Sequence, residues 1–231
     1  MLEGGVRIPV ETQGGAATRH VIDLRPSKIV CVGQNYRAHA AEMGKPVPSE
    51  PVLFLKAPSA MIAAGEPIPR GRSLSRVDYE GELAFVVARR ARRVRAAHAL
   101  DHVLGFCCVN DVTARELQAR DGQWARAKSF DGFCPVGPRI VGGLDPADLR
   151  ITTRVNGEVR QDSRTSDLIF PVPFLIEYIS AYMTLEPGDL VSTGTPSGVG
   201  NLAVGDTVVV EIEGIGALEN PVADDEGDVR A

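Results

Sequence analysis

Three carboxylates lie where this sequence otherwise places core residues. Glu80 and Glu82 stand two residues apart at the start of the apolar run Leu83–Val87, and Asp111 follows a second apolar run at 103–109. The first run predicts a strand, and residues two apart on a strand point to the same face. Like charges held side by side repel unless a shared proton or a cation neutralises them. Hard oxygen ligands favour Mg²⁺ or Mn²⁺ over Zn²⁺, which prefers His and Cys. The alternative is a set of exposed acids at a strand edge.

A histidine and a glutamate are spaced for contact on a short helix. The residues at 35–43 predict a helix that ends at Gly44, and His39 and Glu42 would share one face of it. A carboxylate beside an imidazole raises its basicity and fixes its orientation, as a general base acting on water requires. Flanking glycines and prolines are also typical of a mobile lid. An ordinary surface pair is the alternative.

Two further segments carry residues suited to binding an anion. Lys128 lies among aromatic residues and glycines, where it could neutralise an anionic substrate or a developing enolate. Thr195 lies in the glycine-rich segment at 192–200, which offers amides and hydroxyls to a carboxylate or oxyanion. A surface lysine and a plain turn are the corresponding alternatives.

The remaining pattern predicts many short strands and few helices. Turn-rich sequence at 57–78 and a helical or turn-like segment at 91–100 separate the strands, and an Asn-Gly hairpin turn follows 151–155. No strict βαβ alternation occurs, so the expected class is β-rich α+β. We expect an N-terminal arm or small hairpin at 1–25 and one main domain at 26–231. The expected strands are 28–33, 52–56, 82–88, 103–109, 151–155, 189–193 and 207–213, and the expected helices are 112–119, capped by Asp111, and 175–183.

Composition narrows the possible partners. The net charge of −5 argues against nucleic acid, and the arginines between Arg89 and Arg95 are interpreted as a solvated face. No apolar stretch reaches the roughly 18 residues of a transmembrane helix, and the N-terminus has no secretory pattern. The four cysteines lack paired CxxC spacing and are expected to be reduced packing thiols. We therefore expect a cytoplasmic protein with neither membrane nor nucleic-acid partners.

Six motifs follow one another along the chain, at 32–42, 51–56, 78–83, 110–118, 128–131 and 193–200. Together they resemble the fumarylacetoacetate hydrolase family, and the short acylpyruvase-like proteins in particular. The resemblance implies that family's mixed β-sheet roll, usually as a homodimer. It also implies that Glu80, Glu82 and Asp111 bind Mg²⁺ or Mn²⁺, that Lys128 contacts an oxoacid, and that His39 and Glu42 form a lid dyad. Thr195, Arg115 and Gln118 match positions beside the substrate.

The resemblance implies a metal-dependent enzyme acting on a small oxoacid, in a setting such as aromatic catabolism. The leading hypothesis is hydrolysis of a carbon–carbon bond in an acylpyruvate or fumarylpyruvate, with a metal ion stabilising the leaving enolate. One alternative uses the same site to isomerise 2-hydroxyhepta-2,4-diene-1,7-dioate-type acids or to decarboxylate oxaloacetate. Another is a non-catalytic protein that binds oxoacids.

Overall fold

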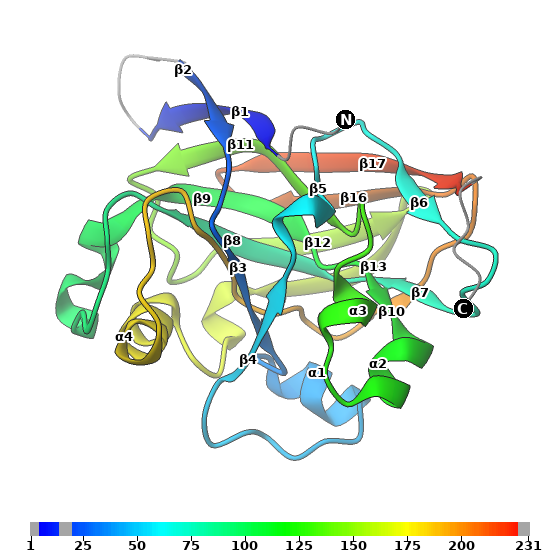
Figure 1. Ribbon diagram of the computed structural model, residues 1–231, viewed down its shortest axis with the longest axis horizontal. Helices are drawn as coiled ribbons and strands as arrows, with labels where there is room; N and C mark the ends of the chain where they lie inside the picture. Colours follow the sequence, from blue (N-terminus) through cyan, green and yellow to red (C-terminus); the bar gives the residue numbers. More distant parts are fainter. Residues whose placement is uncertain (1–4, 14–19, 226–231) are drawn as a thin grey trace.

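Short strands joined by tight turns make up most of the chain, as the computed structural model shows for residues 5–13 and 20–225 (Figure 1). Parts of the segment expected to form an N-terminal arm, at 1–4 and 14–19, lie outside the described residues. Among the residues that are described, no helix is long and apolar enough to cross a membrane. The predicted α+β class, rich in strands, is confirmed.

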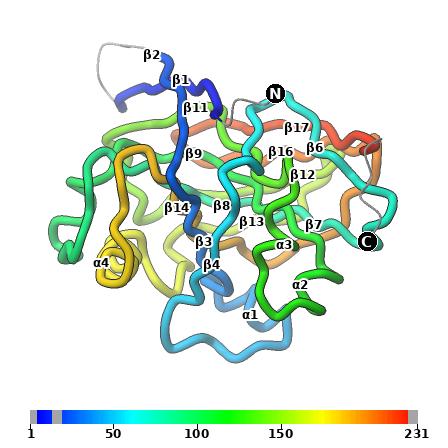
Figure 2. The backbone as a smooth tube through the Cα atoms, in the orientation of Figure 1, coloured from blue at the N-terminus to red at the C-terminus, as the bar shows by residue number. Residues whose placement is uncertain are grey.

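The largest sheet contains nine strands of the described chain. The strand β14 (Leu190–Ser192) pairs with β8 (Gly81–Val87) and with β3 (Ile29–Gly33), which makes distant parts of the sequence neighbours, and Figure 2 shows β14 beside β3. At one edge, β1 pairs with β2 and also runs parallel to β11. In spatial order the strands are β2 (His20–Leu24), β1 (Val6–Thr12), β11 (Cys134–Gly142), β9 (Val103–Asn110), β8 (Gly81–Val87), β14 (Leu190–Ser192), β3 (Ile29–Gly33) and β4 (Val52–Lys56), with β5 (Met61–Ile62) beside β11.

The strand β8 is buried along its whole length because both faces of the sheet are covered. Leu83 and Phe85 face one apolar core, whereas Ala84 and Val86 face another. A strand buried on both sides needs a continuous apolar run rather than alternation, which is the pattern the sequence has here. Glu82 has the same parity as Ala84, so its carboxylate emerges on the second face at the end of the core.

Two smaller sheets and one helix complete the layers. The helix α4 (Val172–Tyr182) and a five-stranded sheet cover the first face, and their buried residues join the same core as Leu83 and Phe85. A three-stranded sheet places β7 directly before the carboxylate segment. The five-stranded sheet contains β13 (Glu158–Arg164), β12 (Arg150–Val155), β16 (Thr207–Ile212), β17 (Gly216–Asp224) and β6 (Ile68–Arg70), and the three-stranded sheet contains β10 (Thr113–Ala114), β7 (Val77–Tyr79) and β15 (Gly200–Asn201).

Three short helices gather at one end of the molecule in Figure 1, near the ends of β3 and β4. They are α1 (Arg37–Glu42), α2 (Arg115–Asp121) and α3 (Ala125–Lys128). 3₁₀ segments occur at Pro58–Ala60, Ala96–His102 and Thr165–Asp167. The stretch at 57–78, expected to be rich in turns, also contains β5, β6 and the start of β7. The sequence pattern did not predict these strands because the runs between the prolines and glycines are too short to show alternation.

The expected helix at 112–119 with an Asp111 cap is wrong at its start. The helix α2 begins at Arg115, its N-cap residue is Ala114, and no side chain caps it. Thr113 and Ala114 instead pair with β7 as the short strand β10. Asp111 is therefore separated from the helix, and its carboxylate is directed to two lysines.

Candidate active site

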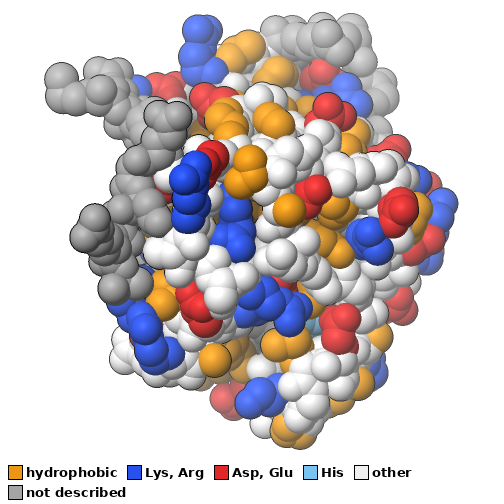
Figure 3. All heavy atoms as spheres, turned by 90° about the vertical axis from the view of Figure 1, so that its right-hand side faces the viewer, with side chains coloured by type: hydrophobic (Ala, Val, Ile, Leu, Met, Phe, Trp, Pro, Cys, Tyr) orange, Lys and Arg blue, Asp and Glu red, His pale blue; other side chains and the backbone are white. Residues whose placement is uncertain are grey.

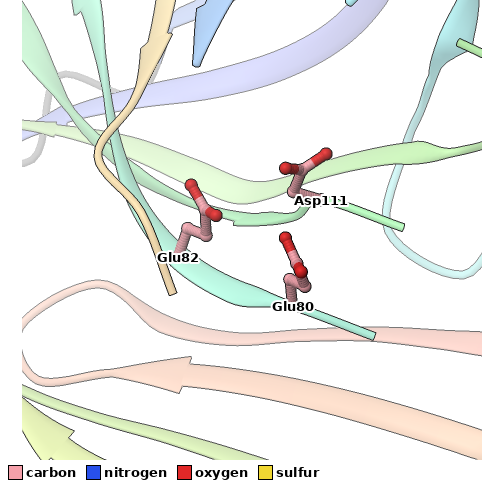
Figure 4. Close-up of side chains that lie close together, drawn as sticks. All are labelled: Glu80, Glu82 and Asp111. Atoms are coloured by element: carbon pink, nitrogen blue, oxygen red, sulfur yellow. The ribbon is translucent and has the colours of Figure 1, made fainter. Parts of the chain in front are cut away.

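The three predicted carboxylates converge on one point. Oxygens of Glu80, Glu82 and Asp111 all lie within 4.8 Å of one another, and all three residues are buried. Figure 4 shows the side chains turned toward one another, with Glu80 and Glu82 coming from one strand segment and Asp111 from its neighbour. The register explains this convergence, because Gly81 pairs with Asn110 and the Asp111 amide donates to the Glu80 carbonyl at 2.8 Å.

Basic side chains neutralise two of the three carboxylates. The Lys128 ammonium donates to Glu80 Oε2 at 2.8 Å and to Asp111 Oδ2 at 2.5 Å, and Arg115 contacts the other Glu80 oxygen. Burial opposes ionisation of Glu80, but Arg115 and Lys128 outweigh it and hold the pKa of that carboxyl well below its usual range. Burial would also lower the pKa of Lys128, but Asp111 and Glu80 raise it to about 12. Lys128 therefore remains a cation.

Glu82 lacks such a partner. Its Oε2 accepts hydrogen bonds from the Ser192 hydroxyl and, at 2.9 Å, from the Gly194 amide, and no basic side chain of the described chain bonds to it. Burial, together with the charges of Asp111 and Glu80, raises the pKa of Glu82 well above its usual range. A dication would supply the missing positive charge, and three hard oxygen donors suit one. The acidic triad can therefore hold a metal ion.

The predicted pair on α1 is in contact. His39 Nδ1 lies 3.0 Å from Glu42 Oε2, as the spacing of three residues predicted. An ionised carboxylate can only accept a hydrogen bond, so Nδ1 carries a proton, and in the neutral imidazole Nε2 is then the nitrogen with the free lone pair. His39 is buried and lines the same cavity as the carboxylates, whereas Glu42 supports it from outside the lining.

One cavity of about 420 Å³ brings together most of the predicted residues. Phe54 and Trp124 form part of its wall, with their rings in edge contact and their centroids 5.1 Å apart. Gly33 makes room for this wall, since a Cβ there would lie 2.8 Å from the Trp124 ring. The lining also includes His39, Lys45, Arg76, Glu80, Glu82, Asp111, Arg115, Gln118, Lys128 and Thr195.

Two of the residues predicted to bind substrate are already engaged with the protein. Arg115 donates through Nε to Asp78 Oδ2 at 2.7 Å and through Nη1 to Gln118 Oε1 at 2.9 Å, in addition to its contact with Glu80. The Thr195 hydroxyl donates to the Gly81 carbonyl at 2.9 Å and accepts from Gln161 at 2.8 Å. Both residues line the cavity, but these hydrogen bonds direct their polar groups toward other protein residues in this structure.

Reasoning from the sequence assigned no role to Lys56. Its ammonium is fully buried and donates to Asp111 Oδ1 at 2.7 Å and to the Val112 carbonyl at 3.2 Å. Lys56 ends β4 with the same parity as Phe54, which lines the cavity. A lysine on the inward face of an apolar strand was the available signal, because such a residue requires a buried acid.

Comparisons with known proteins agree with this arrangement. A model of the C-terminal region of fumarylacetoacetate (FAA) hydrolase matches residues 28–223. The chain is 44% identical over 212 residues to the oxaloacetate tautomerase YisK of Bacillus subtilis, covering 86% of this chain and 70% of YisK.

Solved structures show the same fold. The crystal structure of 5-carboxymethyl-2-hydroxymuconate delta-isomerase from Mycobacterium smegmatis is similar with a TM-score of 0.83 and 50% identity, covering 88% of this chain and 81% of that one. Fumarylpyruvate hydrolase from Pseudomonas aeruginosa, in complex with Mn²⁺ and pyruvate, has a TM-score of 0.83 and 32% identity over 95% of this chain and 97% of that one. Since the family match extends from the strand before α1 almost to the end of β17, this chain belongs to the fumarylacetoacetate hydrolase family.

Proposed function

We propose that this protein is a divalent-metal-dependent hydrolase that cleaves a carbon–carbon bond in a small β-diketo acid of the acylpyruvate or fumarylpyruvate type. The observation that carries the proposal is the placement of His39, oriented by Glu42 at 3.0 Å, in the same cavity as three buried carboxylates. A general base and a site for a dication then face one small substrate.

Glu80, Glu82 and Asp111 would hold Mg²⁺ or Mn²⁺, and the similar hydrolase from Pseudomonas aeruginosa, solved with Mn²⁺ and pyruvate, supports this choice. When bound, such an ion supplies Lewis-acid polarisation to the 2-oxo acid end of the substrate. Arg115 contacts Glu80 and is itself held by hydrogen bonds to Asp78 and Gln118, so it keeps the Glu80 carboxylate in place.

In this proposal His39 moves a proton. Its Nε2 takes a proton from a water molecule, and the resulting hydroxide attacks the carbonyl carbon distal to the 2-oxo acid. The bond between that carbon and its neighbour breaks, the electron pair leaves with the 2-oxo acid fragment, and the fragment then takes up a proton. The Lys128 ammonium, beside Glu80 and Asp111, balances the negative charge that develops on the fragment.

The cavity suits a small organic acid. Its volume of about 420 Å³ is typical of a small-molecule site, with the aromatic wall of Phe54 and Trp124 on one side and the basic side chains of Lys45 and Arg76 also in the lining. On the face in Figure 3, basic side chains gather near the centre with acidic ones around them. That mixture does not favour a polyanionic partner such as nucleic acid.

Tautomerisation of an oxaloacetate-type acid is the second candidate. The observation in its favour is the 44% identity to YisK and the 50% identity to the Mycobacterium smegmatis isomerase, both higher than the 32% identity to the fumarylpyruvate hydrolase. In this reaction His39 would move a proton at the carbon next to the 2-oxo group, and no carbon–carbon bond would break.

A substrate panel separates these reactions. The protein would be incubated with Mg²⁺ or Mn²⁺ and an acylpyruvate, oxaloacetate or a 2-hydroxydienedioate, with products identified by NMR. Two carboxylic acids from the acylpyruvate are expected for hydrolysis. A keto–enol isomer alone would favour tautomerisation, release of CO₂ would indicate decarboxylation, and saturable binding without turnover would contradict an enzymatic role.

A further inference from the structure

Glu42 contacts more than His39. Its Oε2 accepts from His39, and its Oε1 accepts from the Gly198 amide at 2.9 Å. The Glu42 side chain is 33% exposed, and each of its two carboxylate oxygens is held by one of these hydrogen bonds. The Gly198 amide therefore ties α1 to the glycine-rich loop and orients the group that orients His39.

Gly198 is itself held in place by contacts on the side away from Glu42. Its carbonyl accepts a hydrogen bond from the Tyr79 hydroxyl at 2.8 Å. Its φ is +99°, and a Cβ at this position would lie 2.0 Å from the Arg160 carbonyl oxygen, so the backbone packs directly on β13. A glycine in a left-handed conformation is the residue that allows this approach. The position of the loop at Gly198 is thus set by Tyr79 and β13 rather than by α1.

Tyr79 connects this loop to the carboxylate strand. It is the last residue of β7, it directly precedes Glu80, and it pairs with Gly200 across the sheet. We propose that Tyr79 is a positioning residue whose hydroxyl, through Gly198, holds Glu42 and keeps α1 docked with His39 turned into the cavity. The catalytic meaning of this contact rests on the proposed function, whereas the docking of α1 does not.

Tyr36 provides a matched control. It is buried and is the N-cap residue of α1, yet its hydroxyl has no hydrogen-bond partner in the described chain. Tyr36→Phe and Tyr79→Phe each remove one oxygen from a buried tyrosine near α1. Only Tyr79→Phe removes a hydrogen bond.

Hydrogen exchange of the amides at 40–45 tests the proposal without substrate or metal. Exchange in Tyr79→Phe is expected to be about fivefold faster than in the wild type, because one hydrogen bond that resists local opening is lost. Tyr36→Phe is expected to match the wild type. Amides of β8 serve as the internal reference, so that faster global unfolding would be recognised. Exchange of residues 40–45 at the wild-type rate in Tyr79→Phe would overturn the proposal.

A double-mutant cycle with Glu42→Ala shows whether Tyr79 acts through Glu42. If it does, Tyr79→Phe adds no further acceleration in the Glu42→Ala background, whereas additive effects would overturn the proposal. Binding of Mn²⁺ is a separate readout. The Kd for Mn²⁺ is expected to be unchanged in Tyr79→Phe, and a higher Kd would show that the substitution acts on Glu80 instead of on Glu42. If the wild type turned over none of the oxoacids, the proposed function would fail while the exchange result still decided the role of Tyr79.

Discussion

The Lys56 ammonium lies 2.7 Å from Asp111 Oδ1, and neither side chain is exposed to solvent. Asp111 thus meets two lysines, since Lys128 contacts its other oxygen. Lys128 lines the cavity, whereas Lys56 is fixed by the Val112 carbonyl as well. Lys56 is therefore a structural counterion of Asp111, whereas Lys128 can also face a substrate.

Replacing Lys56 by methionine is expected to lower the free energy of unfolding by about 1–3 kcal/mol, because Asp111 Oδ1 and the Val112 carbonyl would lose their buried donor while Lys128 stays beside the other Asp111 oxygen. Urea denaturation followed by circular dichroism measures this change. Lys45→Met is the matched control on an exposed lysine at the cavity and should stay within about 0.5 kcal/mol of the wild type. Equal stability of the two variants would show that the Lys56–Asp111 contact is not a stabilising one.

Replacing Glu82 by glutamine keeps its shape and removes its charge. The affinity for Mn²⁺ is expected to fall by about 100-fold or more, since even outer partners of metal ligands are worth about 10–100-fold. Isothermal titration calorimetry gives the Kd directly, and Glu82→Ala should abolish both binding and turnover. Glu116→Gln, at a half-buried residue of α2 that bonds to Ser75 outside the cavity lining, should bind as the wild type does. An unchanged Kd in Glu82→Gln would remove Glu82 from the ligand set.

Replacing His39 by alanine tests the base. Hydrolysis is expected to slow by about 10²–10⁴-fold, which is the usual contribution of a general base, while the Kd for Mn²⁺ stays the same. Initial rates and calorimetry on the same preparation measure both quantities. His98→Ala, with its exposed side chain, is the control. A His39 variant with the full hydrolytic rate would rule out the proposed role of the dyad.

Asp189 gives a pH-dependent prediction away from the cavity. It is buried, pairs with Lys28 and accepts from the Ser27 hydroxyl at 2.7 Å and the Glu186 amide at 2.8 Å. Burial opposes its ionisation, but the hydrogen bonds from Lys28, Glu186 and Ser27 outweigh it and lower its pKa below the ordinary 3.8. A lowered carboxyl pKa contributes stability above pH 3.8, and that stability is lost as the pH falls through the folded pKa.

Asp189→Asn is therefore expected to destabilise the protein by about 1–3 kcal/mol at pH 7, with a smaller difference from the wild type below about pH 4. Urea unfolding at several pH values measures this convergence. The exposed Asp145→Asn is the control. A difference that stayed constant down to pH 3 would show that the charge of Asp189 contributes nothing.

The sequence pattern predicted those parts of the fold that depend on residues close together in the sequence. The apolar run after Glu80 became β8, and the three-residue spacing of His39 and Glu42 gave their contact. The start of α2 was misjudged because Thr113 pairs with β7, a tertiary contact that outweighs the capping preference of Asp111.

The wider site could be predicted only in part, because its charges are balanced by residues distant in sequence. Lys56 meets an acid 55 residues away, and Ser192 meets Glu82 across 110 residues. No spacing rule reports such pairings. The hydrogen bond from Arg115 to Asp78 likewise depends on how β7 and α2 pack together, and this packing could not be predicted from the sequence.

The position of β14 determines when this cavity can be completed during synthesis. Within the described residues, the β3–β4 hairpin, which carries Lys56, joins the large sheet only through β14, and β14 ends at Ser192. At about 5–20 residues per second, a ribosome needs roughly ten seconds to extend the chain from Lys56 to Ser192. During that interval the hairpin has no strand on its inner side, and Lys56 lacks the sheet that brings it to Asp111. A nascent chain therefore completes its carboxylate centre only after β14 has been synthesised.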